Sequence, residues 1–339
     1  MKYGLSTVRA ARWRRIILAA LVVAAVVQAA PALAQDAWKP TRPVTFIVPN
    51  AAAGTSDRTA REIQRIVQAH RFVEVPILIV NRPGGSGTIA LNQLRASPGD
   101  GHVFLIMNGA TLSAHITGLT PYGHADFTPL ALMVDEYFGI NVRSDSSIRS
   151  ATDMLERLRK SPDALSFGTA SLAGNNYLSM LTALKKGGVD VRRLKAVSFA
   201  GGNESTMALL GGHIHAISTG LGNMAEHLRA GKLRTLVISG PQRMWGPFAQ
   251  VPTWKEIGVD AVASGWRGVL GAKDLTPAQI AYWEGVFRKV IQTPEWNQEL
   301  RENYWVSTYV SAAETRHRLD GEYTELKQIL GDLGMAKVK

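Results

Sequence analysis

The sequence predicts an α/β protein made of two sets of alternating strands and helices. Short β-branched runs are followed, again and again, by small-residue loops and by segments with apolar residues at helical spacing. This pattern restarts near residue 137, and the 339 residues exceed what one ordinary small domain needs. Hydrophobic residues make up 46% of the chain and charged residues 19%, so a sizeable core is expected.

The first 34 residues have the layout of a secretory signal peptide. A basic segment is followed by the uninterrupted apolar run 16–27 and by the small-x-small pattern Ala32-Leu33-Ala34. The apolar run is shorter than the roughly 20 residues that span a bilayer. We therefore expect residues 1–34 to be removed, and the mature protein to be periplasmic, soluble and without a lipid anchor.

Composition excludes several classes of function. The chain has 0 Cys, which excludes disulfides, thiolate metal sites and a cysteine nucleophile. Five of the 38 Lys and Arg residues lie in the first 34 positions, which hold no Asp or Glu. The remainder has 33 basic and 27 acidic residues, a mild excess, and nucleic acid is not an expected partner.

The first α/β set begins with a buried strand over 44–48, which ends at Pro49. A helix over 57–68 follows, with Thr55 or Ser56 as its cap, because its apolar residues recur at helical spacing. This rhythm favours parallel βαβ units. The further elements predicted here are strands at 75–80 and 102–107 and a helix at 88–96.

The second α/β set repeats the rhythm, and the C-terminal third is predicted to be mainly helical. The strands predicted after the restart are 137–142, 165–167, 194–199, 214–218 and 234–239. The predicted helices are 150–160, 177–186, 205–210, 223–230, 277–292, 294–303 and 312–333.

Three loops share a composition that suits an anion. The loops 50–56, 168–176 and 200–204 each follow a predicted strand, consist mostly of small or polar residues, and open a helix. Small residues let backbone N–H groups approach a ligand, and the helix N-terminus adds free donors and partial positive charge. Ordinary strand-to-helix turns also favour these residues, so composition alone leaves both interpretations open.

The first two of these loops lack the side chains that catalysis or metal binding would need. The loops 50–56 and 168–176 contain no Asp, Glu, His, Lys or Arg, so they provide no general base and no metal ligands. Residues 85–90 match the dinucleotide pattern G-x-G-x-x-A only loosely, and His213 and His215, two apart on a predicted strand, have no clear carboxylate partner. We expect no cofactor and no metal.

The ordered motifs of the mature chain resemble the substrate-binding receptors of tripartite tricarboxylate transporters, also called Bug proteins. The resemblance covers essentially all of the mature chain and depends on the order and spacing of short motifs. They are WKP at 38–40, the strand 44–49, the small-residue loop ending at Asp57, AR at 60–61, VNRPGGSG at 80–87, PGDGH at 98–102, DFTPL at 126–130, LLGGH at 209–213, AGKLR at 230–234, VPT at 251–253 and EIG at 256–258.

The resemblance implies a two-lobed periplasmic binding protein fold, similar to type II, with the ligand in the cleft between lobes. It implies lobe 1 at 35–135 plus 255–339, lobe 2 at 136–254, and a monomer that meets membrane permease subunits transiently. Backbone amides of the first strand-to-helix loop, and of its counterpart on lobe 2, would hold a ligand carboxylate. The site residues that it implies are Asn50, Ala51, Ala52, Ala53, Gly54, Thr55, Ser56, Asp57, Asn108, Thr111, Thr169, Ser171, Gly174, Asn175, Gly201, Gly202, Asn203, Ser218 and Thr219.

The first loop departs from the family pattern, which usually has two or three glycines there. In this chain three alanines, 51–53, precede the single Gly54. The added methyl groups would narrow the pocket or shift its backbone. Asp57 has two interpretations: it hydrogen-bonds a polar group of the ligand, or it only favours the helix N-terminus.

We expect a non-catalytic receptor that closes on a small organic carboxylate about a hinge near 135 and 250–260. One alternative is an exported hydrolase or transferase, in which Ser171 or Ser218 would need a histidine nearby. The candidate histidines are His213, His215 and His227. Another alternative is a sensor module whose closed lobes bind a signalling receptor, which the chain alone does not separate from transport.

Overall fold

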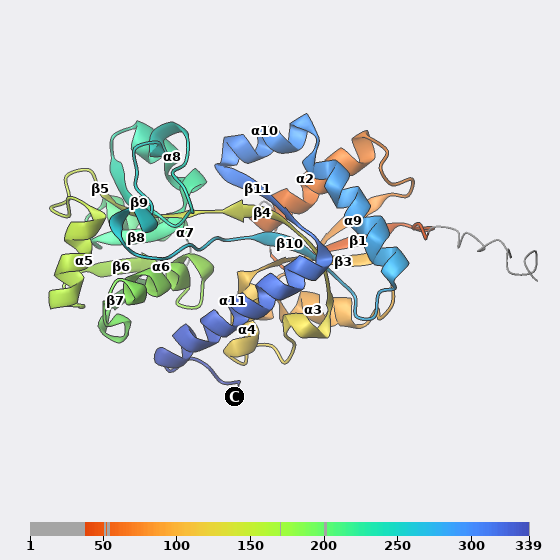
Figure 1. Cartoon of the computed structure of the whole chain (residues 1–339), viewed down its shortest axis with the longest axis horizontal. Helices are drawn as coiled ribbons and strands as arrows, with labels where there is room; N and C mark the ends of the chain where they lie inside the picture. The colour runs from red at the N-terminus through yellow and green to blue at the C-terminus, as the bar shows by residue number, and fades with distance from the viewer. Residues whose placement is uncertain (1–37, 51, 53–54, 170, 200–201, 339) are drawn as a thin grey trace, which may run out of the picture. The chain divides into compact units, whose positions relative to one another are not determined.

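The computed structural model describes residues 38–50, 52, 55–169, 171–199 and 202–338. The predicted signal peptide at 1–34 lies outside the described residues. The chain from Pro40 onward forms one compact unit, and this unit contains two mixed β-sheets, each flanked by helices (Figure 1). The fold is therefore the two-lobed α/β class.

The first sheet has six described strands, in the order β11-β4-β10-β3-β1-β2. β1 pairs in parallel with β2 and β3, whereas β10 is antiparallel to both β3 and β4, and β11 is antiparallel to β4. Its strands are β1 (Val44–Val48), β2 (Ile77–Asn81), β3 (Val103–Asn108), β4 (Thr128–Glu136), β10 (Arg267–Gly271) and β11 (Trp305–Val310).

The second sheet has five described strands, in the order β7-β6-β8-β5-β9. β6 is parallel to β7 and β8, and β5 is antiparallel to β8 and β9. Its strands are β5 (Phe138–Arg143), β6 (Ser166–Thr169), β7 (Lys195–Ser198), β8 (Ala216–Gly220) and β9 (Leu233–Ile238).

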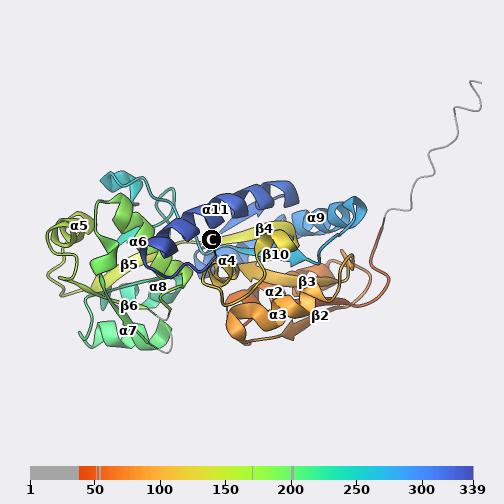
Figure 2. The ribbon, with the colours of Figure 1, turned by 90° about the horizontal axis from the view of Figure 1, so that it is seen from below.

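Helices follow most of the parallel strands and pack on the sheets with their apolar faces. The long helix α11 lies along β4, α4 and α6, as Figures 1 and 2 show from two sides. Around the first sheet the helices are α2 (Thr55–Ala69), α3 (Thr88–Arg95), α4 (Gly109–Ile116), α9 (Pro277–Ile291), α10 (Pro294–Asn303) and α11 (Ala312–Asp332). Around the second sheet they are α5 (Ala151–Lys160), α6 (Asn175–Lys186), α7 (Gly202–Leu210) and α8 (Leu221–Arg229).

Large side chains fill the core of the first sheet. Trp283 is 1% exposed, its ring centroid lies 4.6 Å from that of Phe104, and its indole N–H donates to the carbonyl of Gly101 over 2.9 Å. The buried residues of α2 include Ala60, Ile63, Ile66 and Val67. These are the apolar positions at helical spacing from which the sequence predicts this helix.

Two chain segments pass between the sheets and are hydrogen-bonded to each other. Only Tyr137 separates the end of β4 from the start of β5, and the chain returns from β9 to β10 through residues 239–266. Glu136 and Gly265 exchange both backbone hydrogen bonds, with N···O distances of 3.3 and 2.7 Å. The ends of β4 and β10 are thereby fixed side by side.

The structure corrects several expectations. The predicted parallel units are present, since β1 is parallel to β2 and β3 and β6 is parallel to β7 and β8. Both sheets also contain antiparallel strands that the rhythm did not predict, namely β4, β5, β9, β10 and β11. The C-terminal third contains β10 and β11 as well as its helices. Thr55 and Ser56 lie inside α2 rather than capping it. His213 and His215 precede β8 instead of lying on it.

Candidate functional site

A cavity of about 270 Å³ lies where strand ends and helix N-termini from both sheets meet. The residues around it come from the starts of α2, α4, α6 and α8 and from the two segments that pass between the sheets. The described residues that line it are Thr55, Asn108, Ala110, Glu136, Phe138, Asn175, Asn176, Thr219, Gly220, Asn223, Gly265, Trp266 and Arg267.

The helix N-termini reach this cavity because each helix comes next after a strand of a sheet, directly for α4 and α8 and after the segments 49–54 and 170–174 for α2 and α6. Asn108 ends β3 and caps α4, where its Oδ1 accepts from the backbone N–H of Ala110 over 3.0 Å. Its Nδ2 donates to Ser56 Oγ over 3.3 Å, which links the first turns of α2 and α4. The unpaired backbone N–H groups of such helix starts attract anions.

The N-termini of α4 and α6 are in direct contact. A Cβ on Gly109 would overlap the side-chain amide of Asn175, so only glycine allows this approach. Ser113 Oγ on α4 donates to the carbonyl of Ala173 over 3.1 Å. Asn176 is held as well, because its Nδ2 donates to the carbonyl of Ser218 over 2.6 Å. Hydrogen bonds and close packing therefore fix Asn175 and Asn176 on the second sheet's side of the cavity.

An ion pair forms one wall of the cavity. Arg267 Nη2 donates to Glu136 Oε2 over 2.6 Å, and both side chains are about nine-tenths buried, at 10% and 11% exposure. Arg267 Nη1 donates to the carbonyl of Gly265 over 2.7 Å, and the guanidinium lies 5.4 Å from the ring centroid of Trp305. The composition of the three small-residue loops did not predict this pair, because Glu136 ends β4 and Arg267 begins β10, outside those loops.

The structure brings together only some of the residues that the resemblance implied. Thr55, Asn108, Asn175 and Thr219 line the cavity. Ala51, Ala53, Gly54 and Gly201 lie outside the described residues. The implied residues that are described but do not line it are Asn50, Ala52, Ser56, Asp57, Thr111, Thr169, Ser171, Gly174, Gly202, Asn203 and Ser218.

Several of these other residues serve local structure. Asp57 is 2% exposed, and its two carboxylate oxygens accept from Arg61 Nε and Asn81 Nδ2, each over 2.9 Å. Ser218 Oγ donates to the carbonyl of Asn176 over 2.8 Å. Thr169 Oγ1 accepts from the backbone N–H of Ser171 over 3.2 Å. These contacts shape the strand-to-helix turns around the cavity.

Sequence reasoning missed the other lining residues for two reasons. Ala110 and Asn176 fall inside segments assigned to the site, 108–111 and 168–176, but were not named, and Gly220 and Asn223 were not assigned to it. All four lie at helix starts that were predicted two residues too late or not at all. The remaining missed residues belong to the segments between the sheets, where pairing rather than composition brings them to the cavity. These are Glu136, Phe138, Gly265, Trp266 and Arg267.

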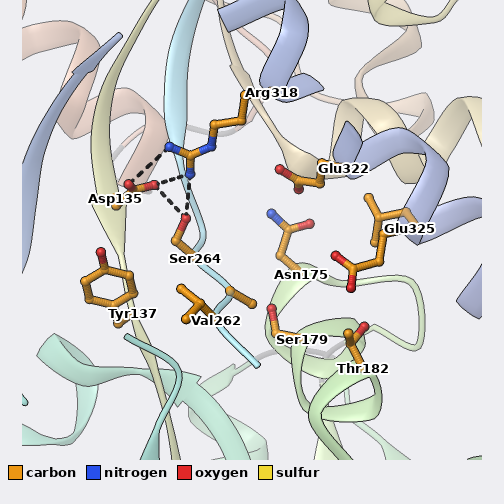
Figure 3. A pocket seen from close by; sticks show the side chains of 12 residues that line it. Asp135, Tyr137, Asn175, Ser179, Thr182, Val262, Ser264, Arg318, Glu322 and Glu325 are labelled. Carbon is orange, nitrogen blue, oxygen red and sulfur yellow. Dashed lines mark hydrogen bonds and ion pairs between the residues drawn. The ribbon is translucent and has the colours of Figure 1, made fainter. Parts of the chain in front are cut away.

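A second cavity, of about 370 Å³, shares Asn175 with the first (Figure 3). On one wall Arg318 donates to both oxygens of Asp135, over 2.7 and 3.3 Å, and to Ser264 Oγ over 3.0 Å. On another, Glu322 Oε2 accepts from Trp266 Nε1 over 2.5 Å. Burial raises the pKa of Glu322 to about 7, against the lowering effects of the hydrogen bond from Trp266 and of the charge on Arg318.

The serine and histidine residues of the enzyme alternative do not pair with each other. His215 Nδ1 lies 2.8 Å from Ser166 Oγ, whereas Ser218 Oγ bonds a carbonyl and Ser171 Oγ accepts from the N–H of Ala173. Within the described part of the chain, no group of three or more His, Asp or Glu side chains is arranged to hold a metal ion. None of the described helices combines the length and apolar character needed to cross a membrane.

Two α/β lobes with a cavity at converging helix N-termini define a bilobal solute-binding protein. The sequence profile described as "Tripartite tricarboxylate transporter family receptor" (TctC) matches residues 60–335. The chain belongs to this family, whose members are periplasmic solute-binding receptors. The expected family, and the expected two-lobed fold with a helix-flanked sheet in each lobe, are therefore confirmed.

Relatives and solved structures agree with this assignment over nearly the whole chain. The UPF0065 protein of the gbd 5' region of Cupriavidus necator is 24% identical over 323 residues, which cover 95% of this chain and 97% of that protein. A TctC solute-binding protein from Polaromonas, solved without ligand, has a TM-score of 0.76 and 24% identity, covering 87% of this chain and 99% of that one.

Two similar structures were solved with a carboxylate. MatC from Rhodopseudomonas palustris, with bound malate, has a TM-score of 0.69 and 22% identity and covers 86% of this chain and 99% of that one. A second R. palustris protein, with adipate, has a TM-score of 0.72 and 24% identity and covers 88% and 99%. At these identities the two structures establish the shared fold.

Proposed function

We propose that this protein is a periplasmic receptor that captures a small organic carboxylate between its lobes and delivers it to a tripartite tricarboxylate-type membrane permease. The observation that carries the proposal is the cavity at which the starts of α2, α4, α6 and α8 converge. Helix N-termini bind carboxylates through free N–H groups and the positive end of the helix dipole. The ligands of MatC and of the adipate-bound protein belong to this chemical class.

The receptor would bind its ligand without transforming it. Most side chains around the cavity are amides, hydroxyls or apolar groups, and the two ionised ones, Glu136 and Arg267, are paired with each other. A general base needs a free acceptor within reach of a substrate proton, and a nucleophile needs a base beside it. The contacts of Ser171 and Ser218 give neither serine such a partner.

We further propose lobe 1 at 35–135 with 255–339 and lobe 2 at 136–254, acting as a monomer that the signal peptide at 1–34 directs to the periplasm. The membership of the strands in the two sheets supports this division. The lobes would close on the ligand about the segments near 135 and 250–260, and the permease subunits would recognise that closed form transiently.

Isothermal titration calorimetry of the mature protein, from Gln35 onward, tests the proposal. We expect at least one acid in a panel of mono-, di- and tricarboxylates to bind with micromolar or tighter affinity. Asn175→Ala, which removes an amide from the cavity wall, should weaken that binding at least tenfold. The matched control Asn92→Ala removes an exposed amide on α3 and should leave it unchanged. Absence of binding by every carboxylate would refute the proposed function.

A further inference from the structure

The cavity contains a carboxylate of the protein itself, which is unexpected in a site for anionic ligands. Glu136 is the last residue of β4 and Arg267 the first of β10, and the backbone pairing of Glu136 with Gly265 holds the two strand ends together. Both side chains line the cavity and are about nine-tenths buried. Removing the two charges from water costs free energy, which their mutual attraction offsets only while the pair stays intact. The pair therefore limits which ligand groups can bind at this wall.

Arg267 is committed to Glu136 and the backbone. Its Nη2 donates to Glu136 Oε2 and its Nη1 to the carbonyl of Gly265, while its Nε is buried and finds no partner among the described residues. The ring of Trp305 covers the guanidinium. A guanidinium has five N–H donors, so a ligand carboxylate that accepts from Arg267 would use the N–H groups that these two bonds leave over. A ligand that broke the pair itself would leave Glu136 buried without its counter-ion.

Glu136 retains acceptor capacity on its other oxygen. Oε2 receives Arg267, whereas Oε1 lies against Gly220, where a Cβ would overlap it. Gly220 is the N-cap of α8 and also lines the cavity. An ionised carboxyl group accepts hydrogen bonds at about four positions and donates none. Glu136 Oε1 therefore favours a hydrogen-bond donor on a ligand.

We propose that Glu136 is a specificity-determining residue that selects carboxylates bearing a hydroxyl or ammonium group. The ligand carboxylate would lie at the starts of α2, α4 and α6, and its donor group would face Glu136 Oε1. Arg267 is a positioning residue, because it fixes the carboxylate plane of Glu136 through Oε2. This inference rests on the proposed function and narrows its substrate class to hydroxy- or amino-carboxylates.

The test compares ligands that differ only in the donor group. Calorimetric Kd values are measured for malate against succinate and for glutamate against glutarate, with the mature protein. In at least one pair the donor-bearing acid should bind at least tenfold more tightly than its plain partner. A site built around a buried hydrogen-bonding group discriminates strongly against a ligand that lacks the complementary group.

The variant Glu136→Gln should abolish this preference. The carbonyl of the introduced glutamine would accept from Arg267, so its amide NH₂ group would face the cavity and supply a donor instead of an acceptor. The ratio of the two Kd values within each pair of acids should then fall to threefold or less, chiefly because the acid without the donor group binds more tightly than it does to the wild type. Glu136→Gln combined with Arg267→Gln removes both charges while keeping similar volumes. This double variant should lose the preference too, and its melting curve checks that the fold survives.

The possible outcomes separate the two proposals. If no carboxylate binds to the wild-type protein, the proposed function and this inference both fail. If carboxylates bind but plain and donor-bearing acids have similar Kd values, the inference alone is overturned. A preference that persists unchanged in both variants also overturns it, because the discrimination would then come from other residues. A preference lost in either folded variant supports it.

Discussion

The indole N–H of Trp266 donates to Glu322 Oε2 over 2.5 Å, and this bond connects the two cavities. Trp266 is 1% exposed and borders the first cavity, whereas Glu322 lines the second (Figure 3). Trp266 precedes Arg267 in the segment that enters β10. A substitution of Glu322 therefore removes a hydrogen bond from Trp266, the residue just before Arg267 of the ion pair.

Glu322 should make the protein less stable as the pH rises from about 4.5 to about 7. Its folded-state pKa of about 7 lies above the ordinary value of 4.5, so the folded state binds the proton more tightly than the unfolded state. The difference between these two pKa values corresponds to a loss of at most about 3 kcal/mol of unfolding free energy at pH 8. Glu322→Gln should remove that slope. Urea unfolding of both proteins at pH 5 and pH 8 measures it.

Comparison with the variant is needed because other groups titrate in the same range. Burial lowers the pKa of His115 below its ordinary 6.5, which makes stability rise with pH and opposes the effect of Glu322. The difference between wild type and Glu322→Gln cancels such contributions. An equal loss of stability between pH 5 and pH 8 in both proteins would contradict the assignment to Glu322.

Two leucines on neighbouring parts of the first sheet should respond very differently to truncation. Leu105 on β3 is 1% exposed, and Leu105→Ala should cost about 2–5 kcal/mol of unfolding free energy because it leaves a cavity in the core. Leu78 on β2 is 49% exposed, and Leu78→Ala should cost less than about 1 kcal/mol. Chemical denaturation of both variants measures this, and equal costs would contradict the core described here.

The contact between Gly109 and Asn175 should couple the starts of α4 and α6. Gly109→Ala forces the Asn175 amide away from its position in both cavities, so ligand affinity should fall several-fold with little change in melting temperature. Once Asn175→Ala is present, Gly109→Ala should have almost no further effect, since contacting residues are not additive. Gly285→Ala on α9 is the control, because nothing lies within 4 Å of the added methyl group.

The pairing of Arg318 with Asp135 should contribute far more than an exposed pair. Asp135 is 4% exposed, and Arg318→Ala would leave its carboxylate buried without a cation, at a cost of about 3–5 kcal/mol. Arg192 and Asp190 also form a pair, at 2.9 Å, but Arg192 is 68% exposed and Arg192→Ala should cost about 0–1 kcal/mol. Urea denaturation distinguishes the two; similar costs would show that the Asp135 pair is solvated.

Local sequence patterns correctly predicted most of the helices and the strands that pair in parallel. β1 spans Val44–Val48 and α10 spans Pro294–Asn303, both as predicted, since each has clear bounds in Pro49 and Pro294. β4 was missed because it is buried between β10 and β11 and shows no alternation of polar and apolar residues. β10 was missed because its five residues include Gly268 and Gly271.

The ion pair of the cavity could not be predicted from local sequence. Glu136 and Arg267 are 131 residues apart, and their contact depends on the antiparallel pairing of two strands that were both missed. Asn175 could be found from local sequence because it lies in the small, polar loop 168–176 after a predicted strand, whereas Asn108 was named only through the family resemblance. Loop composition and the family resemblance together named uncharged residues that line the cavity, Thr55, Asn108, Asn175 and Thr219, and neither pointed to the ion pair.

One residue, Tyr137, separates β4 from β5, and its neighbours Glu136 and Phe138 both border the first cavity. Any rotation of one lobe against the other must be absorbed by torsion angles in this stretch and in the residues just before β10. In the proposed closure, the pivot would include residues that also border the cavity. Substitutions there should then alter the energetics of closure and the affinity for the ligand together.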